Sequence, residues 1–202
     1  LAGFSVGAVE RTGLLPREDD PAKAGDVIIG LASDGLHSNG YSLVRKVVEH
    51  CGAGLDAPAP FDAGQNLDIA LLRPTRIYVR SCLAAVAGGK IKALAHITGG
   101  GLLENIPRVL PAGCGVELDG SSWTAPPVFG WLQAQGNIAD SEMARTFNCG
   151  IGMVAIVDAG DAADTVKVFT AQGETAMAIG RVVEAESQAV TLQNLSSALS
   201  AG

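Results

Sequence analysis

The apolar run at residues 27–31 (VIIGL) constrains the fold more than any other feature of this sequence. An unbroken apolar run of strand length is typical of a strand buried on both faces, whereas a half-exposed strand alternates apolar and polar side chains. A turn of small and polar residues follows at 33–40, and residues 41–49 then place their apolar side chains on one face of a helix. The order strand, turn, helix predicts an α/β layered fold.

The same alternation continues along the chain. Further strands are predicted at 1–11, 91–96, 115–118, 150–157, 176–183 and 189–192. Further helices are predicted at 67–72, 75–87, 101–110, 127–135, 140–145 and 162–172, with Pro74 near the start of the second of these, Gly136 as a C-cap, and Asp140 or Ser141 as an N-cap. Residues 52–65 are rich in Gly, Pro and Ala and indicate a connecting loop. The predicted architecture is a mixed β-sheet covered by helices (α/β or α+β).

Composition narrows the classes of protein to which the chain could belong. Hydrophobic residues make up 48% and charged residues 17% of the 202 residues, which is a globular profile with enough chain for a core. The net charge of -7 argues against a nucleic-acid-binding protein, and no apolar run reaches the length of a membrane span. The four cysteines are far apart, which disfavours a zinc site and indicates buried thiols in a reducing, cytoplasmic environment.

The turn at residues 33–40 (SDGLHSNG) is the first candidate site. It joins a strand to a helix, where backbone N–H groups are free to bind anions such as phosphates. Gly35 and Gly40 allow close approach to a ligand, and His37 could contact a phosphate or transfer a proton. Neutral polar groups come from Ser33, Ser38 and Asn39. The alternative is a purely structural turn with an Asn or Ser N-cap and an exposed histidine, and the residues alone leave both open.

The turn at residues 96–101 (HITGGG) repeats this arrangement before the helix predicted at 101–110. Three consecutive glycines lower the stability of a folded chain, so they indicate either contact with a ligand or a loop pressed against a neighbouring element. Glu104 and Asn105 could bind a ligand or its metal, although a carboxylate there could also complement the helix dipole. His50 ends the first helix, and no role is assigned to it.

Four long strings extend this pattern into a family resemblance. They are GLASDGLHSNGYSLVRK (30–46), RPTRIYV (73–79), AHITGGGLLENIPRVLP (95–111) and TFNCGIGMV (146–154). With these strings in this order, the chain resembles the phosphoribosylformylglycinamidine cyclo-ligases, also called aminoimidazole ribonucleotide (AIR) synthetases. The resemblance implies that residues 1–17 are the last strand and exit of an amino-terminal ATP-binding domain that forms a homodimer, and that residues 18–202 are the carboxy-terminal domain.

The resemblance also implies an activity. Members of this family use ATP and Mg²⁺ to cyclise formylglycinamidine ribonucleotide to aminoimidazole ribonucleotide in purine biosynthesis, releasing ADP and phosphate. The metal ligands and the glycine-rich nucleotide segment are expected in the amino-terminal domain, so no metal ligand is assigned here and the chain alone is expected to be inactive.

The two turns supply the expected site residues. The expected substrate- or phosphate-binding residues are Ser33, Asp34, Gly35, Ser38 and Asn39 on one wall and His96, Thr98, Gly99, Gly100 and Gly101 on the other. His37 is the expected catalytic residue. Two alternatives stay open: a non-catalytic domain that binds substrate phosphate but no ATP, and a related ATP-using enzyme such as a selenophosphate synthetase. The wider superfamily also includes thiamine-monophosphate kinases and hydrogenase-maturation factors.

Overall fold

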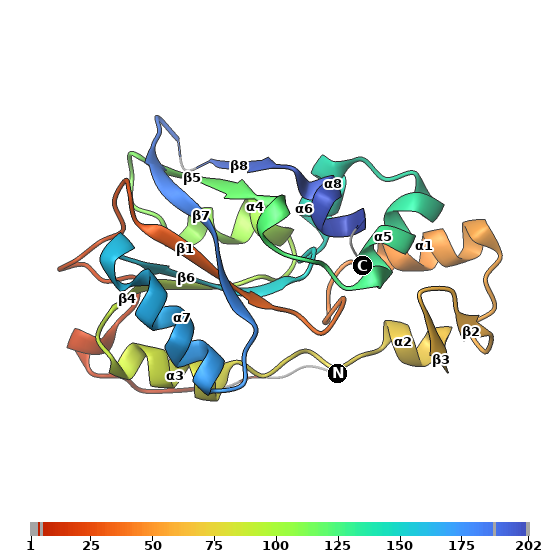
Figure 1. Ribbon diagram of the computed structural model, residues 1–202, viewed down its shortest axis with the longest axis horizontal. Helices are drawn as coiled ribbons and strands as arrows, with labels where there is room; N and C mark the ends of the chain where they lie inside the picture. Colours follow the sequence, from red (N-terminus) through yellow and green to blue (C-terminus); the bar gives the residue numbers. More distant parts are fainter. Residues whose placement is uncertain (1–3, 5, 188, 201–202) are drawn as a thin grey trace.

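The computed structural model describes residues 4, 6–187 and 189–200, and a six-stranded mixed sheet forms its centre (Figure 1). The strand order is β4-β6-β1-β7-β5-β8. The strands are β1 (Val27–Ala32), β4 (Ile91–His96), β5 (Cys114–Asp119), β6 (Ile151–Val157), β7 (Ala176–Glu184) and β8 (Val190–Gln193). Neighbouring strands are antiparallel except for β5 and β8, which are parallel. The predicted mixed sheet covered by helices is confirmed.

Strand β1 lies in the interior of the sheet and is buried on both faces, as its apolar run predicts. Ile28 faces the larger hydrophobic core, whereas Ile29 and Leu31 face a smaller one, and all three side chains are 0% exposed. The larger core lies under α1 (Tyr41–Cys51), α4 (Gly101–Asn105), α5 (Pro127–Gly136), α6 (Asp140–Thr146) and α8 (Leu195–Ser200). Helices α3 (Val79–Ala87) and α7 (Ala162–Ala171) cover the smaller core and lie together in Figure 1.

The direction of the strands brings distant turns to one edge of the sheet. β1 and β4 both pair antiparallel with β6, which lies between them. They therefore run in the same direction and end at the same edge, where β6 begins. The two turns at 33–40 and 96–101 and the loop that precedes β6, residues 147–150, meet there. We call this region, at the carboxyl ends of β1 and β4, the turn edge.

Several predicted boundaries are wrong. The strand predicted at 1–11 falls partly outside the described residues; residues 4 and 6–10 are not in a strand, and Arg11–Gly13 form a 3-10 turn. Phe4 and Val6 are 93% and 83% exposed, so no described element provides this segment with a sheet partner or a core. The expected loop at 52–65 contains the hairpin of β2 (Pro58–Ala59) and β3 (Asp62–Asn66), followed by α2 (Leu67–Leu71).

Helix ends show why local patterns misplace boundaries. The helix predicted at 75–87 begins only at Val79, because the segment before it is held against the first turn by the contacts of Arg76 and Tyr78. The helix predicted at 101–110 ends at Asn105, and a 3-10 turn follows at Pro107–Val109. Proline has no N–H group to continue the α-helical pattern. The N-cap of α6 is Ala139 rather than Asp140 or Ser141, and Asn137 rather than Gly136 is the C-cap of α5.

The sequence predicted buried cysteine thiols and no membrane-spanning helix. All four cysteines are free thiols, and Cys82, Cys114 and Cys149 are buried, whereas Cys51 is partly exposed. Burial raises the pKa of the Cys82 thiol to about 11. Within the described part of the chain, every helix is too short or too polar to cross a lipid bilayer.

Candidate functional site

The two predicted turns lie side by side at the turn edge. A Cβ atom placed on Gly99 would lie 3.6 Å from Oδ1 of Asn39. The start of β6 and the loop before it lie between the turns and bond to the residues that follow both strands. Ser33 N donates to the carbonyl of Gly150 in the loop (2.8 Å), and Ile97 N donates to the carbonyl of Gly152 in β6 (3.0 Å). Residues that are 60 positions apart in the sequence, Asn39 and Gly99, therefore lie next to each other.

Asn148 organises the first turn from beneath. It is 3% exposed, and its Nδ2 donates to the Gly35 carbonyl (2.8 Å) while its Oδ1 accepts from Gly150 N (2.8 Å). Ser33 Oγ lies 2.8 Å from Asn148 Oδ1 and 3.2 Å from the Gly35 carbonyl oxygen, within reach of either acceptor. Asn148 was not among the predicted site residues, although the TFNCG string that contains it was part of the family resemblance. Ser33 and Gly35 thus shape the turn from its buried side.

His37 is buried rather than exposed. It is 3% exposed, and its Nε2 accepts the backbone N–H groups of Asp34 (3.3 Å) and Arg76 (3.4 Å). Nδ1 has no hydrogen-bond partner among the described residues. Burial lowers the pKa of His37, so the ring is neutral near pH 7 and carries its proton on Nδ1. Any proton transfer by His37 must therefore take place at Nδ1.

The charged residue of the first turn is already paired. Asp34 Oδ1 accepts from Arg76 Nη1 (3.0 Å), and Arg76 Nε donates to Glu174 Oε2 (2.7 Å). Glu174 also accepts from the Ser81 hydroxyl (2.7 Å). These bonds fix Arg76 at the side of the turn, where its single positive charge is shared between Asp34 and Glu174. Asp34 is therefore held by Arg76 and belongs to the support of the turn rather than to an anion-binding surface.

The remaining polar residues of the first turn are on its outer side. Ser38 is exposed, and its hydroxyl pairs with Thr75 Oγ1 (2.8 Å) rather than capping α1. The N-cap of α1 is Gly40, which has φ 83° and no capping side chain, so the expected Ser or Asn cap is wrong. The side-chain amide of Asn39 has no hydrogen-bond partner in the described ranges. Ser38 and Asn39 are thus the side chains of this turn best placed for a ligand.

Asn105 organises the second turn as Asn148 organises the first. Its side chain is 4% exposed, and Nδ2 donates to the carbonyls of Thr98 (3.3 Å), Gly99 (3.2 Å) and Gly101 (2.8 Å). Oδ1 accepts from Thr98 Oγ1 (3.0 Å) and Arg108 Nη1 (3.2 Å). The sequence left open whether Asn105 binds a ligand, and the structure shows that its amide is occupied by its own turn.

The three glycines of the second turn have different surroundings. A Cβ on Gly101 would lie 2.1 Å from the Ala144 carbonyl oxygen, and one on Gly100 would lie 2.6 Å from Glu104 Oε2. The structural alternative, a loop pressed against a neighbouring element, therefore accounts for Gly101, whereas Gly100 lies close to the side chain of Glu104 in the helix that follows it. Gly99 is exposed and faces the first turn. Among the described residues, nothing accepts a hydrogen bond from the backbone N–H of Thr98, Gly99 or Gly100.

His96 lies beside a shallow apolar hollow at the end of β4. Both of its ring nitrogens lack hydrogen-bond partners in the described part of the chain, and burial lowers its pKa. The hollow has a volume of about 380 Å³. Its lining is Arg76, Ile77, Tyr78, Val79, Cys82, Leu83, Leu94, His96 and Met153. Tyr78 donates its hydroxyl to the Ala32 carbonyl (2.7 Å), so this side chain ties the hollow to the end of β1.

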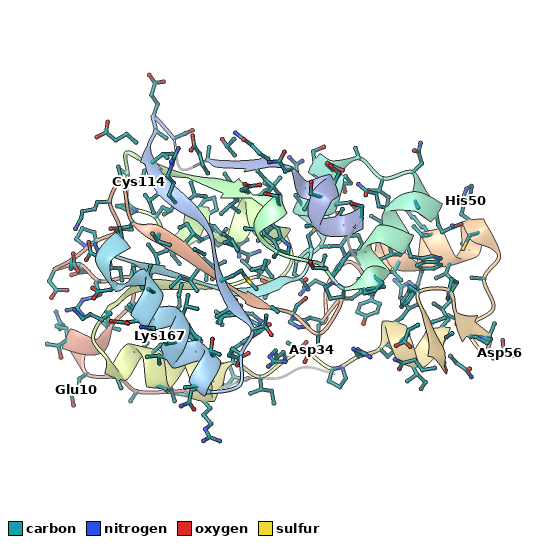
Figure 2. All side chains as sticks on the ribbon, in the orientation of Figure 1. Glu10, Asp34, His50, Asp56, Cys114 and Lys167 are labelled. Carbon is teal, nitrogen blue, oxygen red and sulfur yellow. The ribbon has the colours of Figure 1, made fainter. Side chains whose placement is uncertain are left out.

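The residues at the turn edge do not fit a magnesium ion. Within the described residues, no group of three or more His, Cys, Asp or Glu side chains is placed to hold a metal. Asp34 and Glu174 are already paired with Arg76. Figure 2 shows Asp34 near the end of β1, well away from His50 at the far end of α1. The site of this chain therefore consists of backbone and neutral side-chain groups.

Comparisons with known proteins place this geometry in a family. The profile described as "AIR synthase related protein, C-terminal domain" matches residues 23–193. Thiamine-monophosphate kinase from Stenotrophomonas maltophilia is 18% identical, with a TM-score of 0.56 over 87% of this chain and 52% of that chain. HypE of E. coli is 19% identical, with a TM-score of 0.57 over 86% of this chain and 48% of that one. T. maritima PurL complexed with FGAR is 14% identical, with a TM-score of 0.52 over 86% and 26%.

These comparisons differ in what they establish. At these identities the solved structures support the fold alone, and this chain spans about half or less of the length of each of them. The family profile is more specific, because it covers most of the chain, including both turns and the TFNCG loop. The chain therefore belongs to the AIR synthase related family, whose carboxy-terminal domain it contains.

Proposed function

We propose that this chain is the carboxy-terminal part of a phosphoribosylformylglycinamidine cyclo-ligase, the AIR synthetase of purine biosynthesis. The observation that carries the proposal is that three of the family strings meet at the turn edge. The first turn, the HITGGG turn and the TFNCG loop come from separate parts of the sequence. They lie at the ends of β1, β4 and β6, which are neighbours in the sheet. The similar structure of PurL with FGAR supports the choice of a ribonucleotide as substrate class.

In this proposal, the turn edge binds the phosphate of formylglycinamidine ribonucleotide. The free backbone N–H groups of Thr98, Gly99 and Gly100 and the side chains of Ser38 and Asn39 supply the donors. Such donors suit an anion because they are fixed before it binds. The reaction consumes ATP as the phosphoryl donor that activates the formyl oxygen, after which a substrate nitrogen closes the imidazole ring.

The remaining predicted residues take supporting roles. Ser33, Asp34 and Gly35 shape the first turn through Asn148 and Arg76. His37 stays the proposed proton-transfer residue, and the atom that would transfer the proton is Nδ1, which is buried and has no hydrogen-bond partner among the described residues. His96 forms the wall next to the apolar hollow. We further propose that the complete enzyme is a cytoplasmic homodimer, which light scattering of that enzyme would test.

Calorimetry on the chain tests the proposal. Formylglycinamidine ribonucleotide and ribose 5-phosphate should both bind, whereas ribose should not, because the turn edge offers its donors to the phosphate. ATP should bind weakly if at all, since no group of acidic side chains among the described residues is placed to hold its metal. The proposal is wrong if neither phosphorylated ligand binds while ATP binds tightly.

A second candidate is a related ATP-using enzyme with another phosphorylated substrate. The observation in its favour is that the kinase and HypE structures match this fold as well as PurL does. Thiamine monophosphate, titrated beside formylglycinamidine ribonucleotide, separates the two. Binding of thiamine monophosphate at least tenfold tighter would favour the second candidate. A purely binding domain would hold the ribonucleotide without supporting turnover when the complete enzyme is assembled.

A further inference from the structure

Two buried asparagines occupy equivalent places beneath the two turns. Asn148 and Asn105 are 3% and 4% exposed, and each amide group is hydrogen-bonded on both its nitrogen and its oxygen. Each Nδ2 donates to backbone carbonyls of the turn above it, one for Asn148 and three for Asn105, where the three carbonyls share the two N–H bonds of the amide. A buried asparagine whose amide nitrogen and oxygen are both engaged favours the backbone conformation that keeps these hydrogen bonds.

Because the peptide bonds are trans, a hydrogen bond that holds a carbonyl group also fixes the direction of the N–H group of the next residue. In a trans peptide, the C=O of one residue and the N–H of the next point in opposite directions. Asn105 pulls the carbonyls of Thr98 and Gly99 inward, which directs the N–H groups of Gly99 and Gly100 away from it. Asn148 holds the Gly35 carbonyl in the same way and directs the N–H of Leu36 away from itself.

The hydrogen-bond pattern agrees with this orientation. None of these three N–H groups has an acceptor among the described residues, although the carbonyls attached to the same peptide groups are all engaged. Glycines would otherwise allow the peptide groups to flip, since Gly99 and Gly100 have no side chains to restrict them. A flipped peptide would present a carbonyl oxygen to the ligand in place of an N–H group.

We infer that Asn105 and Asn148 are positioning residues that fix the peptide planes of the two turns, and that Asn105 thereby keeps the N–H groups of Gly99 and Gly100 available to a bound phosphoryl group. Leu36 is 3% exposed, so Asn148 acts by holding the shape of the first turn rather than by presenting the Leu36 N–H to the ligand. This inference rests on the proposed phosphate-binding function of the turn edge. Neither asparagine touches the ligand. Each acts only by removing the alternative orientation of the backbone, and Asn105 has the larger effect because it holds three carbonyls.

The test uses two substitutions at each position and one matched control. Asn105→Ala and Asn148→Ala remove the amide without adding charge. Asn105→Asp and Asn148→Asp keep an oxygen at each acceptor position but replace the donor with a second oxygen. Asn137→Asp, at the exposed C-cap of α5, makes the same charge change away from the turns.

The first readout is the dissociation constant for ribose 5-phosphate. We expect Asn105→Ala and Asn105→Asp to weaken binding at least tenfold, the position-148 variants to weaken it several-fold, and Asn137→Asp to leave it unchanged. Because both asparagines are buried, each variant is measured well below its own unfolding temperature. If the alanine variants bind as tightly as wild type and only the aspartates lose affinity, the effect is one of charge and the inference is wrong.

The second readout does not need a ligand and separates this inference from the proposed function. The heteronuclear ¹⁵N NOE of Gly99 and Gly100 should be that of rigid backbone in the wild-type chain and should fall in Asn105→Ala. Unchanged NOE values in a folded variant would overturn the inference. If the NOE falls but the wild-type chain binds no phosphorylated ligand, the asparagines position the turns and the proposed function is the part that fails.

Discussion

The two ends of strands β1, β4 and β6 differ in the kind of polar group that they bury. At the turn edge the buried polar side chains are mainly neutral (Ser33, His37, Asn105 and Asn148), and backbone N–H groups remain free above them. At the opposite edge, where β4 begins, the buried group is a charge. Lys92 is 1% exposed, and its Nζ lies 3.0 Å from Asp26, 3.1 Å from Asp158 and 3.3 Å from Asp20.

This difference predicts that the two ends of the strands have different roles, one in stability and the other in binding. Burial by itself lowers the pKa of Lys92, but hydrogen bonds from its ammonium group to carboxylates, Asp26 first, raise it overall, so it stays charged. In the Lys92 cluster the buried ammonium group is paired with carboxylates, and Asp158 pairs with Lys23 as well, so an anionic ligand would meet carboxylates there. The turn edge instead satisfies its carbonyls and leaves its donors available. We therefore expect changes at the Lys92 cluster to affect stability and changes on the outer side of the turn edge to affect binding.

The largest expected effect is the loss of stability in Lys92→Met. Removing one member of a buried ionic cluster costs about 3–5 kcal/mol, because Asp26, which is 1% exposed, loses its charged partner and keeps the backbone N–H of Lys23 as a donor. The matched control is Lys90→Met, which removes an exposed lysine paired with Asp161 and should cost about 1 kcal/mol or less. Urea unfolding measures both. Equal losses in the two variants, or weaker ribose 5-phosphate binding by folded Lys92→Met, would break the comparison.

Gly101→Ala should come next. The new Cβ would lie 2.1 Å from the Ala144 carbonyl oxygen, and Gly101 has φ 56°. Overpacking costs about 1–3 kcal/mol, and the left-handed conformation adds roughly 1–2 kcal/mol for a residue with a side chain. Gly89→Ala is the control, since Gly89 has φ 71° and nothing within 4 Å of the added Cβ. It should show only the conformational cost, so a loss as large as that of Gly101→Ala would contradict the close packing of the second turn.

Asn39→Asp tests binding without disturbing the fold. The side chain of Asn39 is partly exposed and faces Gly99 across the turn edge. A carboxylate there should repel a phosphate and weaken ribose 5-phosphate binding about tenfold, or about 1.4 kcal/mol. Asn66→Asp makes the same change at an exposed position of the hairpin and should leave the dissociation constant unchanged. Weakening by both variants to the same degree would indicate a long-range effect of net charge rather than a local site.

The smallest expected effect is a dependence of stability on pH from His37. Burial lowers its pKa below the ordinary value of 6.5, so the unfolded chain binds a proton that the folded chain does not. His37 therefore stabilises the fold above pH 6.5, and this contribution is lost as the pH falls from 6.5 toward the lower pKa of the folded state. His37→Gln should reduce the slope of unfolding free energy against pH in this window, whereas His50→Gln, at an exposed position, should keep it. An unchanged slope in His37→Gln would contradict the neutral, buried state of His37.

The predictability of the fold differs between its strands and its turns. The buried run of β1 predicted the layered fold because its apolar pattern does not depend on distant partners. The start of α3 could not be predicted, because Arg76 is held by His37, Asp34 and Glu174, which lie far from it in the sequence. The strand expected at residues 1–11 was wrong for the described residues, because its pattern says nothing of whether a neighbouring strand is present.

The sequence predicted that the two turns lie at the same side of the sheet, but it did not predict their internal organisation. Turns after apolar strands and before helices mark the edge of an α/β sheet where ligands bind, and both turns lie there. The sequence did not predict which side chains of the turns are exposed to solvent. His37 was interpreted as a ligand contact or an exposed residue and is buried, and Asn148 was not singled out. Which atoms of a turn point inward depends on hydrogen bonds between residues more than a hundred positions apart, such as that of Asn148 with Gly35, and no local pattern records them.

The most direct test of the central claim is an NMR titration of the chain with ribose 5-phosphate, followed through the backbone amide signals. We predict that the largest saturable shifts belong to the amides of residues 36–40 and 98–101, and that the amides around Lys92, Asp26 and Asp158 do not move. Shifts that are absent at both turns, or that are largest at the Lys92 cluster, would contradict the assignment of the turn edge as the phosphate-binding site.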